Sequence, residues 1–222
     1  MKLDIFKHIY HSISIECIYK FMSIKINYSN TVSDKSSANL VLFADEKLNI
    51  SGLKKYLSNS EFSYINDLLK TSDLKKNLFV FEVNSKKKIV LVSIKKDLKS
   101  FDVENLGAEL YGCVNYGKNS GYLINSETIS SKHENFIGLF LHGLKLKSYE
   151  FNKYKTQKDT RLISINVLGN KNKSSVQNQL KFKALEEGIF YAKDLVSEPG
   201  NILHPDEYAK RLNSLRKDGL KV

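Results

Sequence analysis

The sequence predicts an α/β fold, with a mixed, mostly parallel sheet flanked by helices and followed by a long helix. Three observations predict it. From Met22 onward, short apolar or β-branched runs alternate with segments of helical spacing, which is typical of parallel strands joined by helices. Two of these runs are separated only by the polar residues 84–87, which indicates a hairpin and makes the sheet mixed. Near the C-terminus, an apolar stripe of helical period stops at Pro199.

The individual elements follow from these runs in chain order. The predicted strands are residues 22–28, 38–43, 78–83, 88–94, 121–125 and 161–168. The predicted helices in the same region are residues 61–70, 103–116 and 135–146. The last of these is apolar enough for either state, and a capping box formed by Ser131 and Glu134 favours helix.

The longest predicted helix covers residues 176–196. Its apolar residues recur at steps of three and four, at Phe182, Leu185, Ile189, Ala192 and Val196. Ser174 with Gln177 is predicted to cap its start, and Pro199 is predicted to end it. Pro205 suits the first turn of a further helix, where Asp206 and Glu207 lie beside the positive end of the helix dipole.

The charge of the chain admits nucleic acid as a partner without favouring it. The 222 residues carry a formal net charge of +11, and basic surfaces attract phosphates. Only three of the 35 basic residues are arginine, namely Arg161, Arg211 and Arg216. Arginine is the side chain that reads phosphates and guanines with two hydrogen bonds. A solvated lysine surface therefore explains the charge better than a selected binding face.

The N-terminus and the two cysteines indicate a cytoplasmic protein. Residues 1–21 are apolar-rich, but charged residues interrupt any signal-peptide core. Met22 is an alternative start, because a predicted strand begins there. Cys17 and Cys113 are too few for a disulfide framework. No run of eighteen apolar residues occurs, so no membrane span is expected.

Catalytic and ligand-binding motifs are not found in the sequence. His8 and His11 could share a helical face, but no third metal ligand accompanies them. The loop 169–174 has a glycine, lysines and a serine but lacks the second glycine of a phosphate loop. Glu186 and Glu187 are adjacent, so they point about 100° apart on a helix and are interpreted as solvated surface. No catalytic, cofactor-binding or metal-binding residue is therefore predicted in this chain.

Two segments of the chain carry recognisable motifs. The first contains ALEEG at 184–188, AKDLV at 192–196 and the pattern PxNxLxP at 199–205. It resembles the segment that joins the two domains of the leucyl aminopeptidase (cytosol aminopeptidase) family. Gly143-Leu144 followed by SYEFNKYKT at 148–156 resembles the run that closes the family's N-terminal domain. The order and separation of the two motifs are also similar to those of the family. One departure is His204, which stands where the family commonly has a Thr or Ser cap.

The resemblance implies a macro-domain-like N-terminal domain and a place in a larger enzyme. It implies four parts: an extension at 1–21, an α/β domain at 22–172, a linker helix at 173–198 and the start of a catalytic domain at 199–222. The intact family enzyme is implied to be a homo-hexamer that releases N-terminal residues from peptides, with two divalent metal ions, manganese or zinc. The metal-ligand runs of the family do not occur in these 222 residues, so this chain alone is expected to be inactive.

Two other functions stay open at this point. The first is a basic nucleic-acid-binding α/β module, which the net charge would fit. The second is a small-ligand pocket, since the family's N-terminal domain is similar to nucleotide-binding α/β folds, although no glycine-rich loop supports it.

Overall fold

The computed structural model describes residues 24–29, 39–73, 76–115, 121–130, 133–156, 162–169 and 174–222. The chain divides into two compact units. The first, here called the sheet unit, comprises Ser23–Tyr149 and Asp159–Glu186. The second, the helical unit, comprises 150–156 and Glu187–Val222 among the described residues. Each is described by itself.

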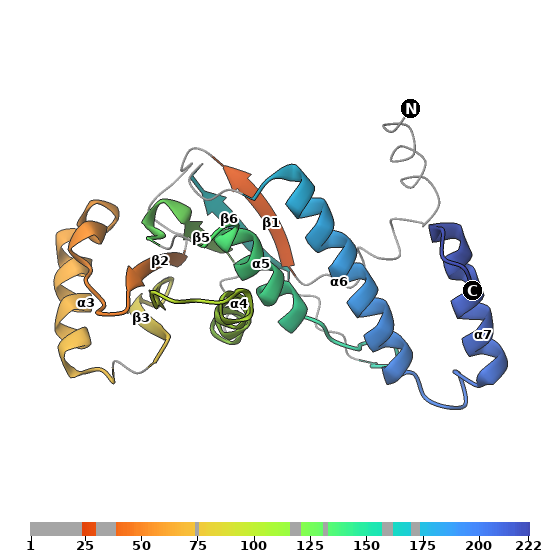
Figure 1. Cartoon of the computed structure of the whole chain (residues 1–222). Helices are drawn as coiled ribbons and strands as arrows, with labels where there is room; N and C mark the ends of the chain where they lie inside the picture. Colours follow the sequence, from red (N-terminus) through yellow and green to blue (C-terminus); the bar gives the residue numbers. More distant parts are fainter. Residues whose placement is uncertain are drawn as a thin grey trace. The chain divides into compact units, whose positions relative to one another are not determined.

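The sheet unit contains one six-stranded mixed sheet, which confirms the predicted fold class (Figure 1). In spatial order its strands are β1 (Ile24–Ser29), β6 (Ile163–Leu168), β5 (Gly121–Asn125), β2 (Asn39–Asp45), β4 (Lys87–Ile94) and β3 (Leu78–Asn84). All neighbouring pairs are parallel except β3 and β4. The central strands β2 and β4 are buried along most of their length, as expected for strands covered on both faces.

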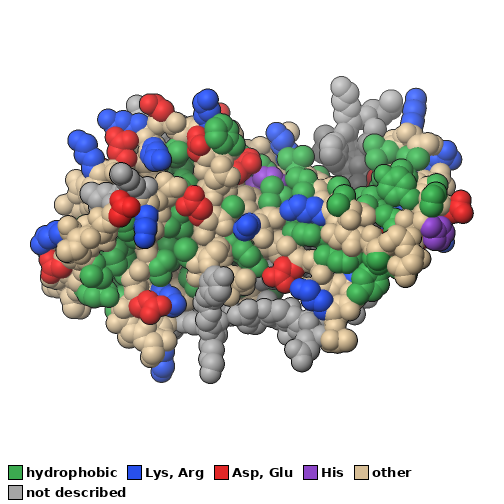
Figure 2. All heavy atoms as spheres, turned by 90° about the horizontal axis from the view of Figure 1, so that it is seen from below, with side chains coloured by type: hydrophobic (Ala, Val, Ile, Leu, Met, Phe, Trp, Pro, Cys, Tyr) green, Lys and Arg blue, Asp and Glu red, His purple; other side chains and the backbone are tan. Residues whose placement is uncertain are grey.

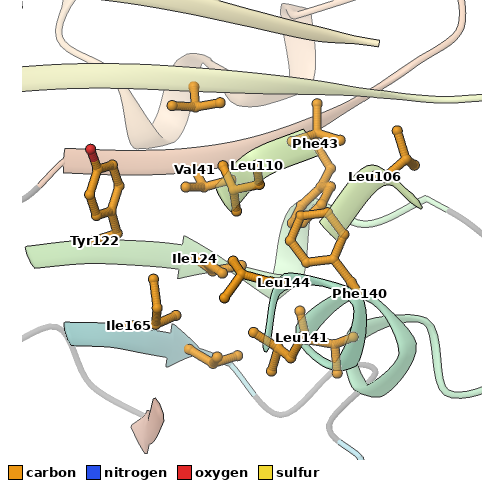
Figure 3. Close-up of a cluster of buried hydrophobic side chains, with 14 of the residues drawn as sticks. Val41, Phe43, Leu106, Leu110, Tyr122, Ile124, Phe140, Leu141, Leu144 and Ile165 are labelled. Atoms are coloured by element: carbon orange, nitrogen blue, oxygen red, sulfur yellow. The ribbon is translucent and has the colours of Figure 1, made fainter. Parts of the chain in front are cut away.

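Helices α4 (Ser100–Val114) and α5 (Phe136–Lys147) cover one face of the sheet. In Figure 3, Phe140 and Leu144 of α5 meet Phe43 and Ile124 from the sheet. The Phe43 ring contacts the Phe140 ring edge-on at a centroid distance of 5.4 Å, an arrangement that aromatic pairs prefer. This cluster is the larger of the two cores.

Two glycines let α4 and α5 approach each other closely. A Cβ atom on Gly107 of α4 would lie 1.8 Å from the carbonyl oxygen of Phe140. A Cβ atom on Gly143 of α5 would lie 1.9 Å from the carbonyl oxygen of Glu104. Each helix therefore presses its backbone against a glycine of the other, and any larger residue there would force them apart.

The opposite face is covered over β2, β4 and β3 by η2 (Ser51–Tyr56) and α3 (Asn59–Thr71). α3 begins with a complete capping box. The Ser58 hydroxyl accepts from the Glu61 amide at 3.2 Å, and the Glu61 carboxylate accepts from the Ser58 amide at 2.9 Å. Ile65 and Leu69 are the buried residues of this helix, and they pack against the sheet.

Several predicted boundaries are wrong by a few residues. The hairpin connection is not the predicted four residues 84–87, because Asn84 and Lys87 belong to strands β3 and β4. The Asn84 side chain accepts from the amides of Lys86 and Lys87 at 2.8 and 2.9 Å and so closes a tighter turn. α5 begins at Phe136 with Asn135 as its N-cap, in the left-handed conformation at φ 59°, and not with the predicted pair of Ser131 and Glu134. Ser131 itself lies outside the described residues.

α6 (Val176–Ser197) is one continuous helix. Its residues through Glu186 belong to the sheet unit, and those from Glu187 belong to the helical unit. Its start differs from the prediction, because the Ser175 hydroxyl accepts from the Asn178 amide at 3.2 Å. The Ser174 hydroxyl is buried and has no hydrogen-bond partner among the described residues. The capping residue of α6 is therefore Ser175.

The predicted apolar stripe of α6 is not a buried face. Leu185 is 44% exposed and Val196 is 86% exposed. The buried residue of this helix is Glu186, which sequence patterning assigned to the solvent. Helical periodicity located the helix correctly but did not identify the side chain that fixes it to the sheet unit.

The helical unit continues with α7 (Pro205–Ser214) and η4 (Leu215–Asp218). Pro205 stands in the first turn of α7, with Asp206 and Glu207 beside it, as predicted. The predicted domain boundaries at 21/22, 172/173 and 198/199 stay predictions. Within the described ranges, the helices are too short or too polar to pass through a lipid bilayer.

Candidate functional site

The most densely bonded polar group of the helical unit is the carboxylate of Glu198. This residue follows the last residue of α6 and precedes Pro199. Its amide still donates to the Asp194 carbonyl at 3.1 Å, in the manner of a helix. Pro199 has no amide hydrogen to continue the helix. Its carbonyl instead accepts from Ile202 and Leu203, both at 2.9 Å, and so forms the turn that leads toward α7.

Three side chains converge on this carboxylate. Lys153 donates to Oε1 and Tyr154 donates to Oε2. Arg211 of α7 donates from Nη1 to Oε1 at 3.0 Å, and its Nε donates to Glu207 Oε1 at 3.1 Å. The Glu198 side chain is only 1% exposed. A buried carboxylate with a hydrogen bond to each oxygen is well compensated for its loss of water.

The electrostatics of the cluster fix the charge on each member. Burial alone would raise the pKa of Glu198, but hydrogen bonds from Lys153, Tyr154 and Arg211 lower it to about 2. The hydrogen bond to Glu198 raises the pKa of Lys153 and of Tyr154 in turn. It also raises the pKa of Arg211. Glu198 is therefore ionised at neutral pH and has no proton to give to a substrate.

This arrangement joins the two segments that sequence patterning singled out. Lys153 and Tyr154 belong to the motif at 148–156, Glu198 directly precedes PxNxLxP, and Arg211 lies on the following helix. Protein donors thus engage each carboxylate oxygen of Glu198, and this carboxylate links the segment at 148–156 to α7. Two features of the sequence point to this cluster: Lys153 and Tyr154 lie within the motif at 148–156, and Arg211 is one of only three arginines.

A second buried carboxylate lies in the sheet unit. Glu186 of α6 accepts from Lys145 Nζ at 2.9 Å and contacts His142 Nδ1 at 3.0 Å, both on α5. Its side chain is 4% exposed, and that of His142 is 5% exposed. The Phe182 ring lies over His142 at a centroid distance of 4.8 Å. The interpretation of Glu186 as solvated surface is therefore wrong, because α5 supplies two nitrogen partners for it.

The remaining sequence candidates are dispersed. His8 and His11 lie outside the described residues, as does most of the loop 169–174. His204 caps α7, but its Nδ1 accepts from the Glu207 amide at 3.5 Å, which is a long hydrogen bond. In the part of the chain that the structure describes, no three His, Cys, Asp or Glu side chains come together as metal ligands. The described residues therefore do not fit a two-metal centre.

The basic side chains do not gather into one patch on the face that Figure 2 displays. Lys and Arg side chains are spread among Asp and Glu side chains there. Several of the lysines are also engaged in ion pairs. Lys87 and Glu61, for example, are 2.7 Å apart and both mostly buried. This face is thus typical of a mixed, solvated surface.

The fold and the Glu198 cluster define the class of this chain. It is a helix-flanked mixed α/β domain, followed in the sequence by a helical segment with a buried, ion-paired glutamate. No family model matches the chain. It is similar to a probable cytosol aminopeptidase of Nitrobacter winogradskyi, 30% identical over 148 residues, which cover 61% of this chain and 28% of that protein. A probable cytosol aminopeptidase of Caulobacter vibrioides is 38% identical over 84 residues, 36% of this chain and 17% of that protein.

Solved structures agree on the fold. A mutant of tomato leucine aminopeptidase matches with a TM-score of 0.65 at 17% identity, over 86% of this chain and 42% of that one. The bottromycin maturation enzyme BotP, solved with manganese, matches with a TM-score of 0.55 at 14% identity, over 81% and 36%. In sequence the chain is therefore similar to part of the cytosol aminopeptidases, and in fold it is similar to part of a leucine aminopeptidase. The matched part spans less than a third of the curated relatives' length.

Proposed function

We propose that this chain is the N-terminal portion of a leucyl-aminopeptidase-like two-metal exopeptidase, which releases N-terminal amino acids from peptides. In this proposal the region has a structural role and organises the assembly, and the hydrolytic residues lie elsewhere in the intact enzyme. The observation that carries it is the convergence of both family-like motifs on Glu198. The curated relatives, named as cytosol aminopeptidases, support it independently.

The proposal assigns no chemical step to the residues of this chain. Two divalent metal ions, manganese or zinc, would polarise the peptide carbonyl and activate water in the intact enzyme. A homo-hexameric intact enzyme and a cytoplasmic location belong to the same proposal, the latter supported by the relatives' names.

Hydrolysis of leucine-p-nitroanilide tests the proposal directly. The 222-residue chain is assayed with Mn²⁺ or Zn²⁺, beside the full-length Caulobacter relative under the same conditions. We expect release of p-nitroaniline by the relative and none above the buffer rate by this chain. Metal-dependent turnover by the purified chain would overturn the structural role proposed for it.

A basic nucleic-acid-binding module is the second candidate, and the net charge of +11 is the observation that favours it. Binding of a labelled DNA duplex is measured at about 50 and 200 mM salt, since phosphate contacts make affinity fall steeply with salt. The dispersed charges of Figure 2 lead us to expect no binding at either concentration. Tight, strongly salt-dependent binding would favour this candidate.

A further inference from the structure

The segments that follow the parallel strands change from one face of the sheet to the other at β2. The chain that leaves β2 forms η2 and α3, which pack on one face. The chains that leave its two parallel neighbours, β4 and β5, lead to α4 and α5 on the opposite face. In open α/β sheets, small ligands bind outside the carboxyl ends of strands at such a reversal. The carboxyl end of β2 is therefore a place where a ligand site is expected.

A pocket of about 280 Å³ lies at this end of β2, between η2 and η3 (Ser126–Thr128). The pocket opens because the pairing of β2 with β5 ends at Val41. From there to Asp45, β2 has no paired strand on the β5 side. The amide of Phe43, which lacks a partner on β5, donates to the Thr128 hydroxyl at 3.0 Å. That hydroxyl donates to the Asn125 carbonyl at 2.8 Å. These two hydrogen bonds tie η3 to the ends of β2 and β5, and so fix one wall of the pocket.

The lining combines a buried apolar part with an exposed charged part. Phe43, Leu53 and Ile129 are the buried apolar members. The exposed charged members are Asp45, Lys55 and Glu127. These apolar residues form the floor of the pocket, and polar and charged groups make up most of its accessible surface.

The charged groups are held in position by their neighbours. Gly169, at φ 101°, lies so close to Glu127 that a Cβ atom would come within 2.4 Å of Glu127 Oε1. The Glu127 amide donates to the Asn125 side chain at 3.1 Å. The Lys55 ammonium lies 4.8 Å from the centre of the Tyr56 ring. Asp45 Oδ1 accepts from the amides of Lys47 and Asn49 at 3.1 and 3.0 Å, which fixes its carboxylate.

The charges select the class of ligand. Two carboxylates and one ammonium repel a phosphate group more than they attract it, which disfavours a nucleotide. They suit a small zwitterion, whose ammonium would bind to Glu127 or Asp45 and whose carboxylate would bind to Lys55. The volume lies at the lower end of ligand pockets, about 300 Å³, and admits one residue-sized molecule. We infer that this pocket binds a free α-amino acid, whose side chain would lie beside the half-buried Tyr56 and above Leu53.

This inference goes beyond the proposed function and does not require it. If the intact enzyme releases apolar amino acids, the pocket would sense a product of the same protein. Leucine binding is measured without any hydrolysis. Failure of the aminopeptidase proposal would therefore not contradict leucine binding, and failure of leucine binding would not contradict the aminopeptidase proposal.

The test is a titration of the isotope-labelled chain with L-leucine, followed by amide chemical shifts. We expect saturable shifts at Tyr56, Thr128 and Ile129. N-acetyl-L-leucine lacks the ammonium and L-leucinamide lacks the carboxylate, so each should bind about tenfold more weakly, the cost of one charge-assisted hydrogen bond. Adenosine monophosphate should cause no shift at these amides. Absence of saturable shifts with leucine, or equal affinity for all three leucine compounds, would overturn the inference.

Matched variants locate the site. Glu127→Gln and Lys55→Ala should each weaken leucine binding about tenfold. Glu46→Gln and Lys96→Ala change exposed residues that do not line the pocket, and they should bind leucine like the unaltered chain. Circular dichroism confirms that all four variants fold. Folded Glu127→Gln and Lys55→Ala variants with unchanged affinity would contradict the assignment.

Discussion

At the scale of single residues, the two buried glutamates determine how the polar groups of this chain are arranged. Glu198 gathers three donors in the helical unit, and Glu186 gathers two partners in the sheet unit. Neither could be recognised from its own sequence neighbourhood, because a glutamate at the end of a helix or on its surface is normally solvated. Their burial depends on partners at a sequence separation of 41 to 45 residues for Lys145, His142, Tyr154 and Lys153.

The lowered pKa of Glu198 makes the stability of the fold depend on pH. Its folded-state pKa of about 2 lies below the ordinary value of 4.5, so the fold favours the ionised form. The resulting stabilisation is fully present above pH 4.5 and is lost as the pH falls from 4.5 toward 2. We expect Glu198→Gln to be less stable than the natural chain at pH 7 and to lose less stability on acidification over this window. Urea midpoints by circular dichroism at pH 7, 4.5 and 3 measure both effects.

The control for this variant is Glu134→Gln, which changes an exposed glutamate. Its urea midpoints should follow those of the natural chain at each pH. If Glu198→Gln showed the same acid dependence as the natural chain, the hydrogen bonds from Lys153, Tyr154 and Arg211 would not set the ionisation of Glu198.

Glu186 and Glu187 offer a matched comparison within one helix. Glu186→Ala removes the carboxylate that Lys145 and His142 share, and leaves their nitrogen atoms in a largely buried site. We expect a loss of about 3 kcal/mol in the free energy of unfolding, as for other broken buried pairs. Glu187→Ala changes an exposed neighbour and should cost clearly less than Glu186→Ala, because no buried nitrogen atom loses its carboxylate. Equal losses in thermal denaturation would show that Glu186 does not fix α6 to α5.

At the scale of elements, periodicity predicted the strands and helices well and their ends poorly. The apolar runs identified all six strands of the sheet, because a buried strand needs a continuous or alternating apolar pattern whatever its neighbours are. Caps and turns were misplaced, as at Asn84, Asn135 and Ser175, because several nearby polar side chains could each have made the same hydrogen bond. The choice among them depends on tertiary packing, which local sequence does not contain.

The contact between α4 and α5 predicts opposite effects for two glycines. Gly143→Ala places a methyl group against the Glu104 carbonyl and should cost about 2 kcal/mol or more, as expected for overpacking against backbone. Gly112→Ala, on α4 with nothing within 4 Å of the added carbon, should be neutral or stabilise by up to about 1 kcal/mol. Urea denaturation of both variants measures the difference. A stable Gly143→Ala protein would mean that the helices can separate without cost.

At the scale of the whole molecule, the sequence established the fold class but not the site. A mixed sheet follows from the order and spacing of apolar runs. The pocket beside β2 could not be foreseen, because its walls come from residues 43–56 and 127–130, which meet only when β5 settles beside β2. No sequence motif indicates that these two segments lie together, because the sheet topology and not a local pattern brings them into contact.

The reciprocal arrangement of Gly107 and Gly143 has a consequence for how this domain can change. Each position is closed by main-chain atoms of the other helix, so a substitution at one cannot be relieved by trimming a side chain at the other. A random library at the two positions, selected for folded protein, should return glycine at both, however freely the neighbouring core residues vary. The distance between α4 and α5 therefore cannot change in small steps: either both glycines are kept, or the close packing of the two helices is lost.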